Sequence, residues 1–226
     1  MKITYIGQAG LLIETDGKKI LIDPYLSDSV AKVNPANYRR QPIDESFLQL
    51  DPDVILCTHD HLDHYDEETL VHYLGKPGKI LFFAPGTAWE KARHFGGGHN
   101  YVRFMRGTVW SEGNVTFTAV RAEHSDPFAI GVILEAEGKR LYITGDTLYH
   151  KDIFAELPCD IDAVFLPVNG VGNNMNMNDA AAFAAKCGAK VAIPFHVGLF
   201  DDLSGKDFPF EPKIVPEIYH EIKLLI

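Results

Sequence analysis

The stretch Thr58-His59-Asp60-His61-Leu62-Asp63-His64-Tyr65-Asp66 is the part of the chain that says most about its fold. It follows an apolar run at residues 54–57, which predicts a short buried strand. It precedes a helical pattern over residues 67–74, for which Asp66 is the expected N-cap. The backbone in between is therefore expected to form a loop at the edge of a sheet.

Four side chains of this loop can face one cavity. His59 and His61 lie two positions apart and point the same way in extended backbone, whereas Asp63 and His64 lie in the turn into the helix. A single His is usually a packed or surface group, and Asp-rich loops usually cap helices. Here three His and two Asp fall within six positions, and burying them without a cation would leave many polar atoms unsatisfied. The cluster predicts a site for zinc, manganese or iron.

Three more candidate ligands each follow a predicted strand. They are His124 after residues 115–121, Asp146 after residues 140–144, and His196 at the end of residues 191–195. Taken singly, a Gly-Asp turn or a strand-terminal His has a common structural explanation. Their shared position at strand ends is what joins them to the main cluster.

Strands and helices alternate in two similar halves. Residues 1–226 are interpreted as one domain of two pseudo-equivalent lobes, each with hairpin strands first and strand–helix units later. Strands are predicted at residues 3–6, 11–14, 19–22, 54–57, 80–84, 101–105, 108–111, 115–121, 130–135, 140–144, 163–168 and 191–195. Two mixed sheets face to face, with helices outside, suit this order.

Further helices are predicted by their capping residues. One opens at the capping-box spacing of Thr87 and Glu90, one is capped by Asn178, and one covers residues 216–224. Residues 23–42, rich in Pro, Asn and Ser, are expected to form a long functional loop.

Composition excludes several classes of protein. The 226 residues include 31 acidic and 21 basic side chains, a formal charge of -10, which argues against a nucleic-acid partner. The three widely spaced cysteines do not predict a disulfide framework. Neither a membrane-spanning run nor a signal-peptide pattern is found, so a cytoplasmic protein without a membrane partner is expected. Homo-oligomerisation is left open.

The pattern His59-x-His61-x-Asp63-His64, followed by His124, Asp146 and His196, resembles the metallo-β-lactamase superfamily. The resemblance extends from Ile22-Asp23-Pro24 to Pro194-Phe195-His196. The Thr58-His59-Asp60-His61, Gly145-Asp146-Thr147 and 189–196 segments are most similar to ascorbate-6-phosphate lactonase-like hydrolases. The resemblance implies an α/β (α+β) fold, the four-layer αββα sandwich of two mixed β-sheets with outer helices.

The same resemblance implies two divalent ions, zinc or manganese with iron as an alternative. His59, His61 and His124 would hold the first ion, Asp63, His64 and His196 the second, and Asp146 would bridge them. A hydroxide shared by the ions would attack an ester, lactone or phosphoester bond of a small polar metabolite, with Asp63 and Asp146 as catalytic residues.

Two departures from the lactonase pattern bear on the substrate. The loop at residues 169–176 contains amides and glycines but no Lys or Arg, which puts a phosphorylated substrate in doubt, and the lactonase lacks a counterpart of His124. Asn169, Asn173 and Tyr25 are the candidate substrate-binding residues, although packing in the core is the favoured role of Tyr25. Asp60 and Asp126 are candidates for orienting the imidazoles, with a loop cap as the equal alternative for Asp60.

Three other functions are weighed. Di-iron oxidoreductases of this scaffold have an acid where this chain has His61, which favours hydrolysis. A nuclease is disfavoured by the acidic charge and by the lack of an additional domain. A metal-binding protein without turnover remains the alternative from outside the enzymes.

Overall fold

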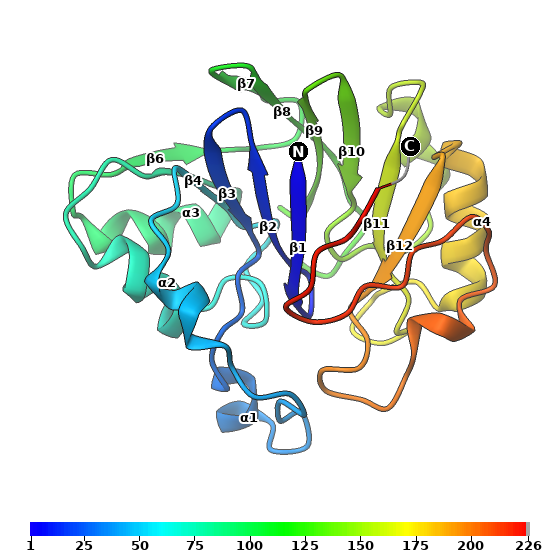
Figure 1. The fold of residues 1–226 in the computed structure, drawn as a ribbon, viewed down its shortest axis with the longest axis horizontal. Coiled ribbons are helices and arrows are strands. Elements are labelled where there is room, and N and C mark those ends of the chain that lie inside the picture. Colours follow the sequence, from blue (N-terminus) through cyan, green and yellow to red (C-terminus); the bar gives the residue numbers. More distant parts are fainter. Residues whose placement is uncertain (225–226) are drawn as a thin grey trace.

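The structure is a computed structural model that describes residues 1–224. Within these residues, twelve strands form two six-stranded sheets that lie face to face, with helices on the outer sides (Figure 1). The expected αββα sandwich of two mixed sheets is confirmed.

The first half of the chain forms one sheet, ordered β1-β2-β3-β4-β5-β6. Its first three strands are antiparallel neighbours, and its last three pair in parallel with the strand before each. The strands are β1 (Lys2–Gly7), β2 (Gly10–Thr15), β3 (Lys18–Ile22), β4 (Val54–Leu56), β5 (Leu81–Ala84) and β6 (Asn100–Arg103).

The second half forms the other sheet, ordered β12-β11-β10-β9-β8-β7. Here β7 to β10 are antiparallel, and β11 and β12 continue in parallel. The strands are β7 (Val109–Glu112), β8 (Val115–Arg121), β9 (Ile130–Ala136), β10 (Lys139–Ile143), β11 (Ala163–Pro167) and β12 (Val191–Phe195).

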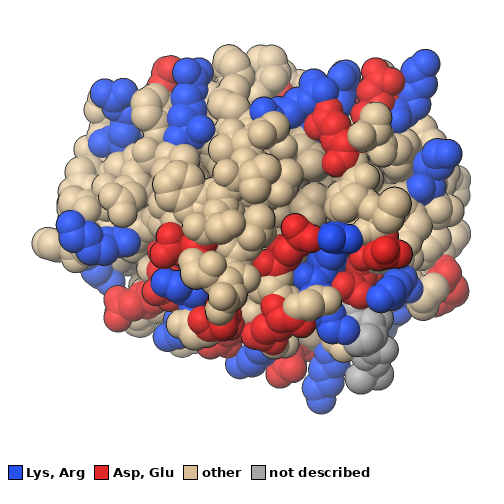
Figure 2. Space-filling view, turned by 90° about the horizontal axis from the view of Figure 1, so that it is seen from above, with Lys and Arg blue, Asp and Glu red and all other residues tan. Residues whose placement is uncertain are grey.

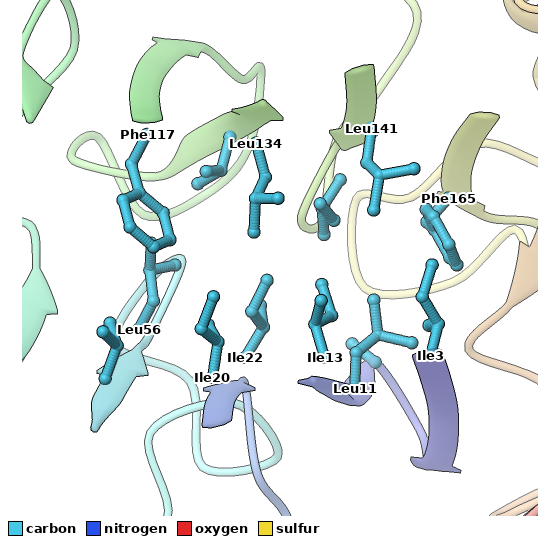
Figure 3. Packing of buried hydrophobic residues seen from close by; sticks show 14 of the residues in the cluster. Ile3, Leu11, Ile13, Ile20, Ile22, Leu56, Phe117, Leu134, Leu141 and Phe165 are labelled. Carbon is cyan, nitrogen blue, oxygen red and sulfur yellow. The ribbon is translucent and has the colours of Figure 1, made fainter. Parts of the chain in front are cut away.

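The main core fills the space between the sheets. Alternate residues of β2 show the reason, because Leu11 and Ile13 pack against the opposite sheet while Leu12 packs under the helices. Figure 3 shows side chains such as Ile22 and Leu134 pointing toward one another from the two sheets. Apolar burial on both faces makes these strands nearly continuous hydrophobic runs.

Helices cover both outer faces (Figure 1). The helices α2 (Glu67–Leu74) and α3 (Gly86–Ala92) cover the first sheet, and α4 (Met177–Cys187) covers the second. The short α1 (Ser29–Val33) lies in the predicted long loop, and the 3-10 helices are η1 (Glu45–Gln49), η2 (Arg93–Phe95), η3 (Lys151–Ala155) and η4 (Gly205–Asp207). None of the helices among residues 1–224 combines the length and apolar character needed to cross a bilayer.

Three helix predictions were wrong in detail. The cap of α3 is Pro85 rather than Thr87, and that of α4 is Asn176, whose side chain accepts from the N–H groups of residues 178 and 179. In place of the predicted helix at 216–224, the chain makes a turn at residues 218–220 and then runs extended beside the free edge of β1, where Ile222 N–H donates to the Ile3 carbonyl. This pairing satisfies backbone groups that an open sheet edge would leave exposed.

One edge of the sandwich collects the carboxyl ends of nine strands. The strand pairings make β1 and β3 to β6 run the same way in the first sheet, and β8, β10, β11 and β12 in the second. Arrowheads of β1, β10 and β12 point to the lower edge in Figure 1. Residues that directly follow these strands are therefore brought together.

The opposite rim carries charge of both signs. Figure 2 shows Lys and Arg side chains interspersed with Asp and Glu around an uncharged band. Ion pairs on this rim include Lys190 with Asp162 at 2.7 Å and Arg140 with Glu135 at 2.6 Å. This face is not a continuous basic surface.

Candidate metal centre

The structure brings all seven predicted ligands together. Their imidazole nitrogens and carboxylate oxygens form three overlapping groups, in each of which the atoms lie within 4.8 Å of one another. The groups are His59, His61 and His124; His59, His64 and Asp146; and Asp63, His64 and His196.

The first group consists of three imidazoles. His124 Nε2 lies 3.1 Å from His61 Nδ1, and the ring centroids of His59 and His61 lie 4.6 Å apart. His59 Nδ1 lies 3.0 Å from the Thr58 hydroxyl, which leaves Nε2 directed into the group. His124 Nδ1 faces the Asn173 carbonyl at 3.2 Å, so Nε2 is the nitrogen available to a cation.

The group of Asp63, His64 and His196, called the second group from here on, combines a carboxylate with two imidazoles. His196 Nε2 lies 3.2 Å from both His64 Nε2 and Asp63 Oδ2, and the His64–Asp63 distance is 3.7 Å. Metal–nitrogen bonds of about 2.0–2.1 Å separate tetrahedral ligand atoms by about 3.3 Å. The spacing therefore matches ligands that share one small divalent cation.

Asp146 connects the two groups, because it forms a third group with His59 of the first and His64 of the second. One oxygen, Oδ1, is 3.3 Å from His64 Nε2, and the other, Oδ2, is 3.2 Å from His196 Nε2 and accepts from Asn174 Nδ2 at 2.8 Å. His59 Nε2 and Asp146 Oδ1 are both buried without a hydrogen-bond partner among the described residues. Such orphaned atoms are costly unless a cation satisfies them, so the residues fit the two divalent ions.

The carboxylates and imidazoles of the site shift each other's pKa values in opposite directions. Burial alone would lower the pKa of His64 and His196, but the carboxylates of Asp146 and Asp63 outweigh it. They hold the pKa of His64 well above its usual range and raise the pKa of His196 to about 9. Burial would raise the pKa of Asp63 and Asp146, yet the neighbouring imidazoles hold both pKa values below the usual range. A cation entering the site has to displace protons from imidazoles.

His59 differs from these two imidazoles. Burial and the neighbouring His64 imidazole hold the pKa of His59 well below its usual range. Its ring is therefore neutral and available as a ligand at neutral pH without loss of a proton.

Sequence reasoning missed Asp23. This fully buried residue follows β3, and its carboxylate accepts from Thr58 N–H and Thr58 Oγ1, each at 2.7 Å. Its Oδ2 also lies 2.8 Å from His64 Nδ1, which leaves His64 Nε2 for a cation. The only sign in the sequence was a single Asp directly after a strand, as for Asp146.

Asp60 and Asp126 were expected to orient imidazoles, but their contacts lie elsewhere. Asp60 Oδ1 pairs with Lys91 Nζ at 2.8 Å. Asp126 accepts from the Asp60 and Phe128 N–H groups, so both residues fix the loop.

A cavity of about 650 Å³ opens beside the second group of ligands. Its lining includes Gln8, whose Nε2 donates to Asp63 Oδ2 at 2.7 Å and which sequence reasoning also missed. Asn169 and Asn173 line the cavity as expected. Tyr25 does not line it, because its ring is fully buried and its hydroxyl accepts from Val30 N–H.

Known proteins resemble this chain over most of its length. The model of the Beta-lactamase superfamily domain matches residues 18–197. A UPF0173 metal-dependent hydrolase of Geobacillus thermodenitrificans is 30% identical over 238 residues, covering 96% of this chain and 95% of the relative.

Two solved structures share the fold. The isothiocyanate hydrolase from Delia radicum gut bacteria has a TM-score of 0.77 at 20% identity and covers 99% of each chain. CmlA, a diiron β-hydroxylase from Streptomyces venezuelae, has a TM-score of 0.69 at 17% identity, over 91% of this chain and 48% of that one.

The chain belongs to the metallo-β-lactamase superfamily. Within that superfamily its sequence places it among the UPF0173 metal-dependent hydrolases.

Proposed function

We propose that this protein hydrolyses a carboxylic ester or lactone bond of a small metabolite. Water is added across the acyl–oxygen bond, giving a carboxylic acid and an alcohol, which remain one molecule when a lactone opens. The observation that carries the proposal is a ligand set for two cations that opens directly into a cavity. Two bound cations, zinc or manganese with iron as the alternative, would supply an acidified water and polarise the electrophilic oxygen.

The surrounding side chains hold and orient the reacting groups. Asp63 and Asp146 stay ionised at neutral pH, because the pKa of each lies below its usual range, and both line the cavity. An oxygen of either carboxylate can accept a proton of an incoming water and so orient it. The amide of Gln8 holds Asp63 from the other side.

The substrate and partners form part of the same proposal. The lactonase-like resemblance favours a lactone, whereas the lack of Lys and Arg around the cavity disfavours a phosphate group and with it a phosphoester. The formal charge of -10 and the mixed charges in Figure 2 support a small-molecule substrate rather than RNA. We further propose a cytoplasmic protein that acts without a membrane partner, alone or as a homo-oligomer.

The test begins with elemental analysis of protein purified without added metal. A panel of esters, lactones and phosphodiesters then follows, with an isothiocyanate included because one structural neighbour carries that activity in its name. Oxygen consumption of the iron-loaded protein separates a di-iron oxidoreductase. Oxygen turnover with no hydrolysis of any panel member would overturn the proposal.

Asp146→Asn separates an enzyme from a passive metal-binding protein. We expect kcat/KM to fall by about a hundredfold or more, with an unchanged circular dichroism spectrum, because one anionic oxygen between the two ligand groups is lost. Asp160→Asn, on an exposed residue away from the cavity, is the matched control and should retain activity. Equal activity of both variants would contradict the role of Asp146.

A further inference from the structure

Apart from the ligands and Asp201, the cavity beside the metal centre is lined by uncharged residues, some of them apolar. Its apolar members are Val30, Val171, Phe200 and Leu203. Val171 and Leu203 remain 63% and 43% exposed, which leaves apolar surface at the cavity.

The lining contains no Lys or Arg among the described residues. Its one carboxylate outside the ligand groups, Asp201, accepts from the Gly198 and Leu203 N–H groups. Arg39 and Arg40, close in sequence to the lining residue Asn37, are engaged elsewhere: Arg39 donates to Tyr25 O at 2.9 Å, and Arg40 pairs with Asp202. An anionic group away from the ligands would find no Lys or Arg among the described lining residues.

We propose that the substrate carries an uncharged, apolar substituent next to its scissile bond and that the cavity rejects an anionic substituent. This inference rests on the proposed hydrolase function. Desolvating a carboxylate or phosphate without a partner is unfavourable, whereas each methylene buried against the apolar side chains gains about fourfold in affinity. The overall acidic charge acts in the same direction on the approach of the substrate.

The experiment compares two esters that differ at one end. 4-Nitrophenyl valerate ends in a methyl group, whereas 4-nitrophenyl hemiglutarate has a carboxylate in its place. With the metal-loaded protein, and after subtraction of the uncatalysed rate, we expect kcat/KM to favour the valerate by about tenfold or more. Saturation-transfer NMR with valeramide and glutaramate measures the same preference without turnover.

Leu203→Lys should reverse the preference, because it places a cation on the cavity wall. Val109→Lys makes the same charge change at an exposed position, 60% accessible, on the distant strand β7, and should leave the preference unchanged. If neither ester is hydrolysed, the proposed function fails. If both are hydrolysed and the hemiglutarate is used equally or better, this inference alone is overturned.

A second, independent observation concerns Asn169. Its Nδ2 lies 3.0 Å from His196 Nδ1, while its own Oδ1 is buried without a hydrogen-bond partner. Rotation of the amide by 180° exchanges the two atoms, so that Oδ1 accepts a proton from Nδ1. Gln8 Nε2 lies 3.1 Å from both ring nitrogens, so this contact does not select one nitrogen over the other.

The geometry points to Asn169 as a positioning residue for the second cation. An amide oxygen on Nδ1–H fixes the tautomer in which Nε2 of His196 carries the free lone pair. That nitrogen lies 3.2 Å from Asp63 Oδ2 and 3.2 Å from Asp146 Oδ2, in the second ligand group.

The test measures zinc affinity by competition with a chromophoric chelator and the His196 tautomer by nitrogen-15 NMR of the zinc-loaded protein. Asn169→Ala should weaken binding of the second zinc by about 10–100-fold, and Asn169→Asp should restore it because a carboxylate also accepts from Nδ1–H. Asn37→Ala removes another amide from the cavity lining and should leave both measurements unchanged. Wild-type affinity in Asn169→Ala, or a protonated Nε2, would overturn the assignment.

Discussion

Asp23 shows how one buried carboxylate organises the metal loop. It accepts from Thr58 twice and faces His64 Nδ1, so it connects the end of β3 to the loop after β4. Loss of this carboxylate would remove the acceptor that faces His64 Nδ1.

Asp23→Asn should weaken binding of the second zinc by about 10–100-fold. The amide can satisfy Thr58 N–H, but its Nδ2 then faces the Thr58 hydroxyl and His64 Nδ1, which shifts the His64 proton to Nε2. Unfolding free energy should fall by about 1–3 kcal/mol. Isothermal titration with zinc and chemical denaturation measure the two effects.

Asp66→Asn is the matched control for Asp23→Asn. Asp66 is equally buried near the same loop, but its carboxylate accepts from Glu68 N–H and Thr69 Oγ1 rather than from an imidazole. If this variant loses zinc affinity as much as Asp23→Asn, the effect belongs to loop stability and not to tautomer control.

Metal binding should release protons in a pH-dependent way. The pKa of His196, raised to about 9 by the Asp146 and Asp63 carboxylates, means that the metal-free ring is protonated at neutral pH. A cation binds only the neutral ring, so apparent zinc affinity should rise with pH from 7 towards about 9. Titration calorimetry in buffers of different ionisation enthalpy counts the protons, and zero protons released at pH 7 would contradict this.

At the level of single residues, the sequence predicted the ligands best where several His and Asp residues lie close together in the chain. The ligands could be predicted because each follows a strand and four of them share one loop. Asp23, Gln8 and Asn174 could not, because a lone Asp, Gln or Asn is common in turns. Their role depends on which strand ends lie side by side, and only the sheet order shows that.

The turn after β10 depends on a close approach between elements. Gly145 has φ +60°, and a Cβ there would lie 2.8 Å from the Ile130 carbonyl oxygen and 3.0 Å from Thr58 Cβ. The turn that carries Asp146 therefore packs directly against Thr58, at the start of the loop that carries His59 to His64. A side chain would push the two elements apart.

Gly145→Ala should lower the unfolding free energy by about 2–4 kcal/mol, from backbone strain together with overpacking, and should also weaken zinc binding. Gly113→Ala is the control, because Gly113 has a similar φ of +63° and open space around its Cβ position. It should lose only about 1–2 kcal/mol and keep its zinc affinity. Equal losses in denaturation experiments would show that the close approach contributes nothing.

Strands could be predicted better than the last segment because their patterns were less ambiguous. In residues 216–224, Ile218 and Ile222 are four apart, as on one face of a helix, yet they pack on the core from a turn and from extended chain, respectively. Ile222 and Leu224 are two apart, which is equally typical of a strand. The free edge of β1 decided between the two, and it is a tertiary feature.

Across the whole molecule, the ligands come from both sheets. His59 to His64 follow β4 of the first sheet, and His124, Asp146 and His196 follow strands of the second. Backbone bonds also cross between the halves here, from His196 N–H to Gln8 O at 2.8 Å and from Ile130 N–H to Thr58 O at 3.1 Å. Cation binding should therefore stabilise the entire sandwich.

Removal of the metal by a chelator should lower Tm by about 5–10 °C. At a hundredfold excess over Kd, a bound cation contributes about 2.7 kcal/mol, and each kcal/mol shifts Tm by about 2–4 °C at this chain length. Differential scanning calorimetry before and after chelation, and after zinc is restored, measures the change. An unchanged Tm in demonstrably metal-free protein would mean that the halves do not depend on the cation.

The separation of the two rims has a practical consequence. The hairpin turns Asp16-Gly17, Gly113-Asn114 and Glu137-Gly138 join the strands at the rim away from the ligands. Gly113 adds open space around its Cβ position, so a fluorophore or immobilisation peptide grafted there should be sterically tolerated. Immobilisation of the protein through that turn would leave the rim with the metal ligands facing the solution.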